Sequence, residues 1–141
     1  HKGCFFVGAN AAALRGDLEA AAQAEEWAYL RETVAAAPAD ATHRFVIMHW
    51  PLFIQHPDEE ECYWNMPNRH QLVQFFKESK ITCVLSGHWH QDIDVTWQGV
   101  PLITSIGTCR QLQYPEETAF KLVAVFDDGF SVRRVSVETV A

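Results

Sequence analysis

Three of the seven histidines stand where buried strands are expected to end. His49 closes the apolar run RFVIMH, and His88 and His90 follow the apolar run ITCVLS and Gly87. In open α/β sheets the loops after neighbouring strands converge at the carboxyl ends of those strands, where ligands bind. Imidazole is a good ligand for Zn, Mn and Fe, and a glycine allows the backbone to turn tightly before the pair. The pattern therefore predicts a metal site.

The same histidines have plainer interpretations. A single strand-end histidine is more often a hydrogen-bonded core residue, and a His-x-His pair can occur by chance on a surface loop. The combination favours metal binding, because Pro51 follows His49 two residues later and a Gly-His-x-His sequence follows a second strand. A mononuclear zinc site with water as the fourth ligand is an alternative that uses all three histidines.

Apolar runs and helical periods alternate before this pattern changes to paired strands. Gln23, Trp27, Leu30 and Val34 fall on one helical face, and Leu72, Val73, Phe75 and Phe76 on another. Asn65 is expected to cap the second helix, and Gln98-Gly99 and Asp128-Gly129 to form hairpin turns. The expected strands are 4–10, 44–49, 81–86, 92–97, 100–106, 120–126 and 130–137, and the expected helices are 19–36 and 67–80. The Ala-rich stretch 9–41 reads as solvated helix and loop, and 52–66 as a long loop.

Bulk composition limits the classes of function. A chain of 141 residues fits one domain spanning 1–141. The formal charge of -7 with only eleven Lys and Arg argues against a nucleic-acid partner. No apolar run reaches the roughly 20 residues that span a membrane. Four cysteines without C-x-x-C spacing indicate free thiols and hence a reducing, cytoplasmic compartment. The chain begins with His1, so we expect its natural start to lie upstream.

Several of these motifs together resemble the calcineurin-like metallophosphoesterases. The family has a strand-end His, usually with Pro soon after, followed by Gly-His-x-His; VIMHWPLF and SGHWH match these blocks about forty residues apart. The stretch QAEEWAYLRETV is similar to the helix that precedes them in the family. More narrowly, HWPLF, YWNMP and the Ile-Gly-Thr-Cys stretch at 106–109 look like the small calcineurin-like phosphoesterase-domain proteins implicated in protein dephosphorylation.

The resemblance implies a fold, a cofactor and a reaction. The fold would be α/β, the C-terminal portion of a four-layer α/β/β/α sandwich with two mixed sheets. His49 and His88 would bind one divalent metal ion and His90 the other, with Mn, Fe and Zn left open. Two such ions about 3.5 to 4 Å apart hold a phosphoryl oxygen and generate a hydroxide nucleophile. The implied activity is metal-dependent hydrolysis of a phosphoester, as a phosphatase or phosphodiesterase, on a phosphorylated protein or small molecule.

The chain departs from the family pattern in its missing early motifs. Residues 1–141 contain no Asp-x-His, no Gly-Asp with its bridging carboxylate, and no Gly-Asn-His-Asp or -Glu. The resemblance therefore implies a C-terminal portion that is weakly active by itself, with the leaving-group histidine upstream. The alternative is a non-catalytic metal-binding or partner-binding module.

Other residues near the predicted site are provisional candidates for supporting roles. Asp92 or the acidic run 58–61 could replace the missing carboxylate, although a solvated loop is the plainer interpretation of the run. Tyr63 and Asn65 could line a substrate cleft, and Arg110 could pair with phosphate unless it is an ordinary surface arginine. Trp89 is expected to pack.

Overall fold

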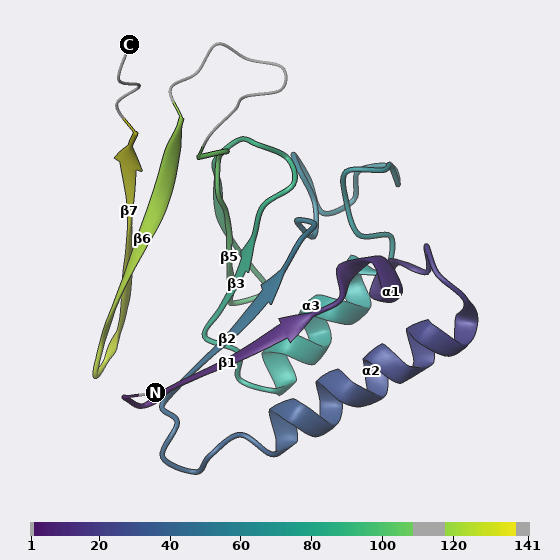
Figure 1. Cartoon of the computed structure of the whole chain (residues 1–141), viewed down its shortest axis with the longest axis horizontal. Helices are drawn as coiled ribbons and strands as arrows, with labels where there is room; N and C mark the ends of the chain where they lie inside the picture. The colour runs from purple at the N-terminus through teal and green to yellow at the C-terminus, as the bar shows by residue number, and fades with distance from the viewer. Residues whose placement is uncertain (1, 109–117, 138–141) are drawn as a thin grey trace.

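The computed structural model describes residues 2–108 and 118–137 of the chain. A mixed five-stranded sheet has helices on one face and a two-stranded sheet on the other (Figure 1). The elements are β1 (Cys4–Ala9), α1 (Ala11–Arg15), α2 (Ala20–Ala35), β2 (His43–Met48), α3 (Arg69–Glu78), β3 (Cys83–Ser86), β4 (Ile93–Trp97), β5 (Val100–Thr104), β6 (Ala119–Phe126) and β7 (Gly129–Ser136).

The five-stranded sheet has the strand order β1-β2-β3-β5-β4. Strands β1, β2, β3 and β5 run parallel to one another. The edge strand β4 pairs antiparallel with β5 through the expected turn at Gln98-Gly99. Phe45 and Val46 are both fully buried although they point to opposite faces of β2, as the continuous apolar run predicts for a strand covered on both sides. The sheet therefore brings the carboxyl ends of β2 and β3 together.

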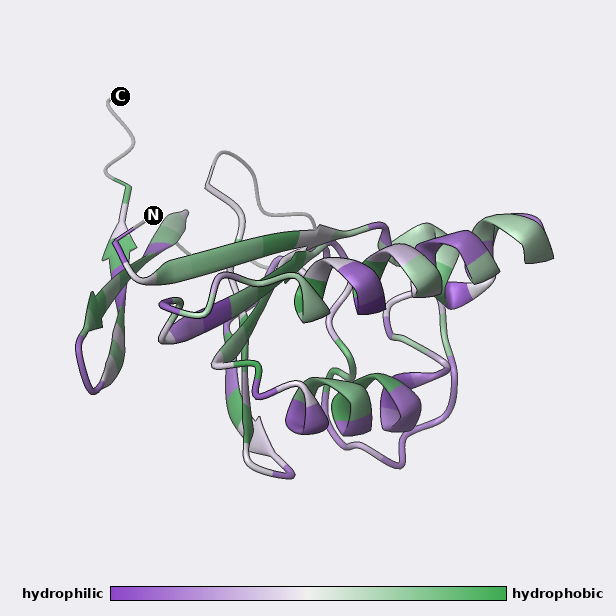
Figure 2. Cartoon of the chain, turned by 90° about the horizontal axis from the view of Figure 1, so that it is seen from below, coloured by the Kyte–Doolittle hydropathy of each residue, from purple (hydrophilic) through white to green (hydrophobic). Residues whose placement is uncertain are grey.

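Helices α2 and α3 form where the apolar period predicts them. Trp27, Leu30 and Val34 of α2 are buried, and Figure 2 shows hydrophobic and hydrophilic residues alternating along the helices. Helix α3 begins at Arg69, two residues later than expected, and buries Leu72, Val73 and Phe76. The prediction that Asn65 caps α3 is wrong, because Asn68 occupies the N-cap position.

A short helix lies in the Ala-rich stretch, where only solvated helix and loop were expected. In α1 the side chain of Asn10 accepts a hydrogen bond from the Ala13 N–H and so caps the first turn. Gly16 ends the helix with φ 87°, a left-handed conformation that glycine adopts without steric cost. Ala11, Ala13 and Leu14 are buried, so the alanines provide close packing and leave Arg15 at the end of the helix.

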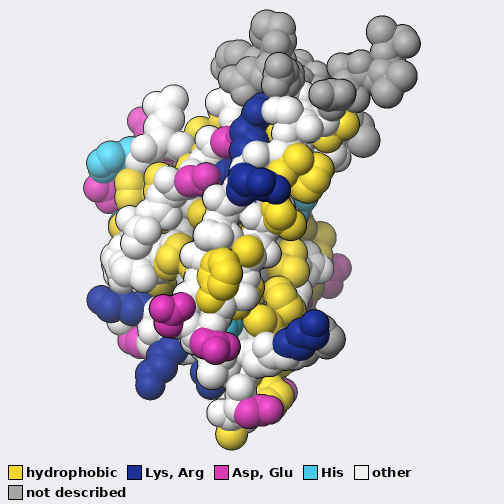
Figure 3. Space-filling model, turned by 90° about the vertical axis from the view of Figure 1, so that its left-hand side faces the viewer, with side chains coloured by type: hydrophobic (Ala, Val, Ile, Leu, Met, Phe, Trp, Pro, Cys, Tyr) yellow, Lys and Arg dark blue, Asp and Glu magenta, His cyan; other side chains and the backbone are white. Residues whose placement is uncertain are grey.

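Strands β6 and β7 form the hairpin expected around Asp128-Gly129 and pack on the sheet face opposite the helices. Phe45, Cys83 and Ile103 form a second small core with side chains that include Val123 and Phe130. Figure 3 faces this side of the molecule and shows hydrophobic side chains over it, and β6 carries three exposed large ones: Phe120, Leu122 and Phe126. The described residues thus form a helix layer, a mixed sheet and two strands of a second sheet. No helix among them is long and apolar enough to cross a membrane.

Candidate metal centre

His49 and His88 meet at the carboxyl ends of β2 and β3. Nε2 of His49 lies 2.8 Å from Nδ1 of His88, and the two ring centroids are 4.6 Å apart. The backbone holds this arrangement, because the Gly87 N–H donates to the His49 carbonyl at 3.0 Å. The parallel pairing of the two strands therefore brings together two histidines that are 39 positions apart in the sequence.

The nitrogen separation suits two ligands of one ion. Zn–N bonds of about 2.0 to 2.1 Å place two histidine nitrogens about 2.8 to 3.4 Å apart at angles between 90° and the tetrahedral value. The observed 2.8 Å is at the lower edge of this interval, so a small ring movement admits an ion. Nε2 of His88 is also buried without a hydrogen-bond partner in the described part of the chain. Nδ1 of His88 is paired with His49, so Nε2 is the ring nitrogen of His88 that an added group would satisfy.

The environment of His88 keeps its imidazole neutral. Burial lowers its pKa, and the positive charges of His49, His90 and Arg15 lower it further, to about 4. A neutral imidazole is the form that binds metals, because the protonated ring has no free lone pair on nitrogen. At neutral pH His88 is therefore in the form that a metal site requires.

The Gly-His-x-His turn places its strain on the histidines. His88 and His90 have φ values of 63° and 58°, whereas Gly87 is not in the left-handed region. The expectation that Gly87 would provide the tight turn is therefore wrong. A non-glycine residue in this region costs about 1 to 3 kcal/mol, although His tolerates it better than most residues. Such strain is frequent at functional sites and here orients both histidine side chains.

An aromatic cluster surrounds His88. The rings of Trp50, Tyr63 and Trp64 lie 4.7, 5.3 and 5.2 Å from its ring, measured between centroids. Trp64 also contacts Trp89 at 5.7 Å, which confirms that Trp89 packs within the fold. The loop between β2 and α3 provides three of these rings, and the apolar faces limit the access of water to one side of the histidine pair.

Arg15 is a member of this site that the sequence did not identify. Its guanidinium lies over Trp50 at 5.4 Å and over Tyr63 at 6.0 Å from the ring centroids. Its Nε donates to Asp17, and Nη1 donates to the Cys62 carbonyl. The only signal in the sequence was the RGD tripeptide, because the short helix that positions Arg15 could not be recognised in the Ala-rich stretch.

The three provisional substrate residues have different outcomes. Tyr63 is 60% exposed and lies beside His88, so its side chain can reach a ligand. Asn65 is fully buried, and its side chain bonds to Cys62 N–H, to a Glu59 carboxylate oxygen and to the Glu60 carbonyl. The structure therefore gives Asn65 a role inside the loop instead of in a cleft. Arg110 lies outside the described residues.

Glu59 and Arg69 organise the loop that carries the aromatic cluster. The Glu59 carboxylate accepts hydrogen bonds from the backbone N–H groups of residues 54, 55 and 56 and from Asn65 Nδ2. Arg69, only 5% exposed, donates to the carbonyls of Pro57, Glu59 and Met66. Partial burial raises the pKa of Glu59, but its hydrogen bonds outweigh this effect and lower the pKa overall. The carboxylate of Glu59 is thus a structural anion.

No carboxylate among the candidates joins the histidine pair. Asp92 forms ion pairs with Lys121 at 3.1 Å and with Arg134 at 3.0 Å, and so connects the mixed sheet to β6 and β7. Asp58 lies near His56 and His70. Within residues 2–108 and 118–137, no group of three or more His, Cys, Asp or Glu side chains is arranged to hold a metal. His90 influences His88 electrostatically without completing such a group.

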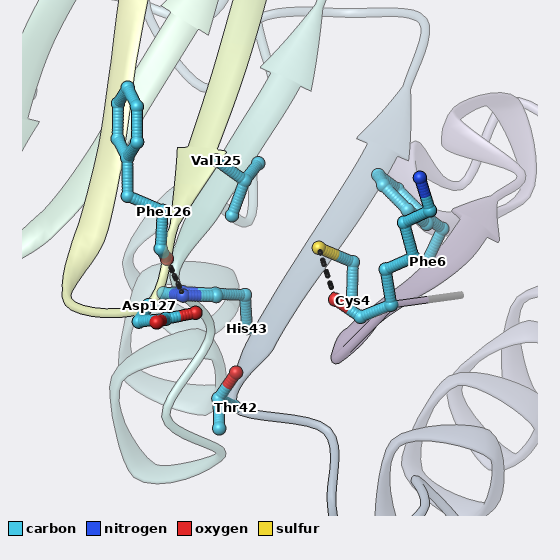
Figure 4. Close-up of a pocket in the computed structure, with 8 residues that line it drawn as sticks. Cys4, Phe6, Thr42, His43, Val125, Phe126 and Asp127 are labelled. Atoms are coloured by element: carbon cyan, nitrogen blue, oxygen red, sulfur yellow. Dashed lines mark hydrogen bonds between the residues drawn. The ribbon is translucent and has the colours of Figure 1, made fainter.

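Two cavities differ in their relation to this centre. One, of about 240 Å³, is lined by Trp64, Trp89, Ile54, Cys62, Glu59 and Glu60, and we call it the Trp64–Trp89 pocket. The other, of about 220 Å³, lies where β1 and β2 begin, beside the turn of the β6–β7 hairpin. Figure 4 shows His43 there, bonded through Nε2 to the Phe126 carbonyl at 2.7 Å. The second cavity is therefore at the end of the sheet remote from His49 and His88.

Comparison with curated proteins gives relatives over part of the chain. Serine/threonine-protein phosphatase CPPED1 of Danio rerio is 34% identical over 79 residues, which cover 55% of this chain and 26% of that protein. The Rattus norvegicus protein of the same name is 33% identical over 72 residues, covering 50% and 23%. The matched region thus spans about a quarter of the length of these relatives. No family model matches the chain.

Solved structures share the fold at low sequence identity. GAP50, the anchor in the inner membrane complex of Plasmodium, superposes with a TM-score of 0.74 and 14% identity over 94% of this chain and 45% of that one. A dimetal phosphatase from Danio rerio gives a TM-score of 0.62 and 17% identity over 79% and 35%. These matches confirm the expected α/β fold of the metallo-dependent phosphatase type.

Proposed function

We propose, from the premise that this chain is related in sequence and fold to the calcineurin-like metallophosphoesterases, that it contributes to metal-dependent hydrolysis of a phosphoester. The observation that carries the proposal is the pair of nitrogens, His49 Nε2 and His88 Nδ1, 2.8 Å apart at the ends of two adjacent parallel strands. The named phosphatase relatives align with about half of the chain, and they support the same reaction class.

Each residue of the site has a part in this proposal. His49 and His88 would hold one divalent ion, and His90 would contribute to a second, with Mn, Fe or Zn as candidates. Divalent ions supply positive charge that polarises a phosphoryl oxygen and lowers the pKa of bound water. Trp50, Tyr63 and Trp64 exclude water from one side, and the Arg15 guanidinium keeps the rings of Trp50 and Tyr63 in place. The substrate would be a phosphorylated protein or small molecule.

Metal binding tests the histidine assignment directly. In isothermal titration with Zn²⁺ or Mn²⁺, we expect His49→Ala and His88→Ala each to weaken the first binding event. Loss of a group that only supports a ligand already lowers metal affinity by about 10- to 100-fold, so loss of a ligand should lower it at least as much. His56→Ala is the matched control, because His56 is an exposed histidine of the β2–α3 loop that pairs with Asp58. Equal affinity in all three variants would refute the assignment.

The stoichiometry distinguishes two ions from one. If His90 serves a second ion, His90→Ala should retain one bound ion per chain by elemental analysis. His49→Ala should instead lose the ion that His49 and His88 hold. A mononuclear site would bind one ion and lose it in all three variants. Hydrolysis of p-nitrophenyl phosphate and its bis ester with added Mn²⁺ then tests the reaction itself.

A second function has one observation in its favour. GAP50, which shares this fold with a TM-score of 0.74, is described as the anchor in the inner membrane complex of Plasmodium. A non-catalytic binding module would bind little metal and give no metal-dependent hydrolysis of either p-nitrophenyl ester.

A further inference from the structure

The Trp64–Trp89 pocket shares a wall with the histidine pair. The Trp64 ring lies 5.2 Å from His88 on one side and 5.7 Å from Trp89 on the other. Trp89 stands between His88 and His90 in the sequence, so the turn that presents the two histidines also forms the pocket. A ligand held at the histidines would therefore have a neighbouring group within reach of the pocket.

The walls combine indole faces with negative charge. Trp64 and Trp89 provide aromatic surface, and Glu59 and Glu60 are acidic residues among those that line the pocket. Glu59 stays ionised, since its hydrogen bonds lower its pKa, but its oxygens are occupied by the loop. Glu60 is exposed, and only its backbone carbonyl forms a hydrogen bond among the described residues. A free carboxylate beside two indoles is a suitable environment for a cation, because tryptophan is the best aromatic partner for one.

Two arginines lie beside this pocket without lining it. Arg15 pairs with Asp17 and donates to the Cys62 carbonyl, and Arg69 donates to the carbonyls of Pro57, Glu59 and Met66, so neither guanidinium pairs with the Glu60 carboxylate. The pocket of about 240 Å³ has room for several water molecules. A long side chain can therefore enter with its aliphatic part against Ile54 and the indoles and its charge near Glu60.

We propose that the Trp64–Trp89 pocket binds a Lys or Arg side chain of a phosphopeptide substrate, within two residues of the phosphorylated position. The inference rests on the proposed function and names the substrate class that the site would prefer. In an extended peptide, side chains two residues apart lie on one face at about 6.6 Å, and the Trp64 ring that separates the pocket from His88 lies 5.2 Å from the His88 ring. The phosphate would lie at the histidines and the basic side chain beyond Trp64.

The test compares peptides that differ at one position. Phosphoserine peptides flanked by alanines, without tryptophan, carry a single Arg at one of the two positions before or after the phosphoserine. The phosphoserine is replaced by its non-hydrolysable phosphonomethyl analogue, and binding to the 141-residue chain is measured by isothermal titration calorimetry with added Mn²⁺ and about 0.15 M salt, which screens long-range attraction. We expect Arg to bind roughly fivefold to tenfold more tightly than Ala at one or two positions, as a partly desolvated cation–aromatic contact predicts. Leu at the same position should bind no better than Ala.

Two matched variants assign the preference to the pocket. Glu60→Gln should reduce the ratio of Arg to Ala affinity to about twofold, because a neutral amide leaves only the indole faces. Glu61→Gln should keep the full ratio, since Glu61 is an exposed neighbour that does not line the cavity. Using the ratio within each variant cancels any general loss of binding.

The outcomes separate this inference from the proposed function. Equal affinity for Arg and Ala peptides, equal affinity for Arg and Leu peptides, or the same fall in ratio for both glutamate variants would overturn the pocket assignment. A preserved Arg preference without Mn²⁺-dependent hydrolysis of p-nitrophenyl phosphate would support the pocket and count against the hydrolase.

Discussion

Glu59→Gln tests whether one carboxylate holds the aromatic loop in place. In the native protein Oε1 accepts from Ile54 N–H and Asn65 Nδ2, and Oε2 accepts from Gln55 N–H and His56 N–H. Each carboxylate oxygen accepts from two N–H groups, so whichever oxygen is replaced by the glutamine NH₂ group, two N–H donors then face that group instead of an acceptor. The least costly arrangement places the amide nitrogen toward residues 55 and 56, because both are exposed and water can replace the lost bonds.

The size of the effect follows from the two bonds that remain. A hydrogen bond to a charged group contributes about 1.5 to 3 kcal/mol, and one to a neutral group about 0.5 to 1.5. Each retained bond on Oε1 therefore weakens by about 1 kcal/mol, and the free energy of unfolding should fall by about 2 kcal/mol. For a domain of this size that corresponds to a Tm decrease of about 7 °C.

Thermal unfolding followed by circular dichroism from pH 7 to pH 3.5 provides the measurement. The pKa of Glu59 is lowered in the folded state, so its contribution is complete above the unfolded value near 4.5 and disappears as pH falls through the folded value. The difference in stability between wild type and Glu59→Gln should therefore shrink below about pH 4.5. Glu61→Gln, at an exposed neighbour, should change the free energy by less than about 0.5 kcal/mol at all pH values. A Tm equal to that of Glu61→Gln, or a difference that does not depend on pH, would refute the reasoning.

Two further predictions concern the same loop and the core. Arg69→Met should lower the free energy of unfolding by about 2 to 3 kcal/mol in denaturant titration, because it leaves part-buried carbonyls of Pro57 and Glu59 without a donor, and an unchanged midpoint would contradict this. A maleimide or similar thiol reagent at pH 8 should modify exposed Cys62 much faster than Cys83, since burial and the nearby Asp94 charge raise the pKa of Cys83 to about 12. Mass spectrometry of the native chain should find Cys83 unmodified while Cys62 is labelled, and equal labelling would show that the second core opens readily.

The sequence by itself determined the elements that have strong periodicity and the place where chemistry could occur. Continuous apolar runs specified β2 and β3 because strands covered on both faces have no polar side. The parallel arrangement follows from alternating strands and helices, and it predicts that strand-end residues such as His49 and His88 meet. Helix α2 was equally clear, since Trp27, Leu30 and Val34 repeat with the helical period.

The tertiary structure decided which side chains surround the histidines. Helix α1 is too short to show a period, and its burial under the mixed sheet places Arg15 beside Trp50 and Tyr63. The loop after β2 has no periodic pattern of apolar residues either. Only the folded structure shows that Asn65 is buried and bonded to Glu59 within the loop, whereas Tyr63 is exposed. Asp92 likewise looked available in sequence, and the packing of β6 against the sheet pairs it with Lys121.

The physical reason for this division is the range of the interactions involved. Periodicity reports how a segment divides between core and solvent, and neighbouring residues determine that locally. The ion pairs of Asp92, the rings around His88 and the strain at His88 and His90 depend on contacts between segments distant in sequence. Such contacts exist only after the strands have paired, so only the folded chain could assign them.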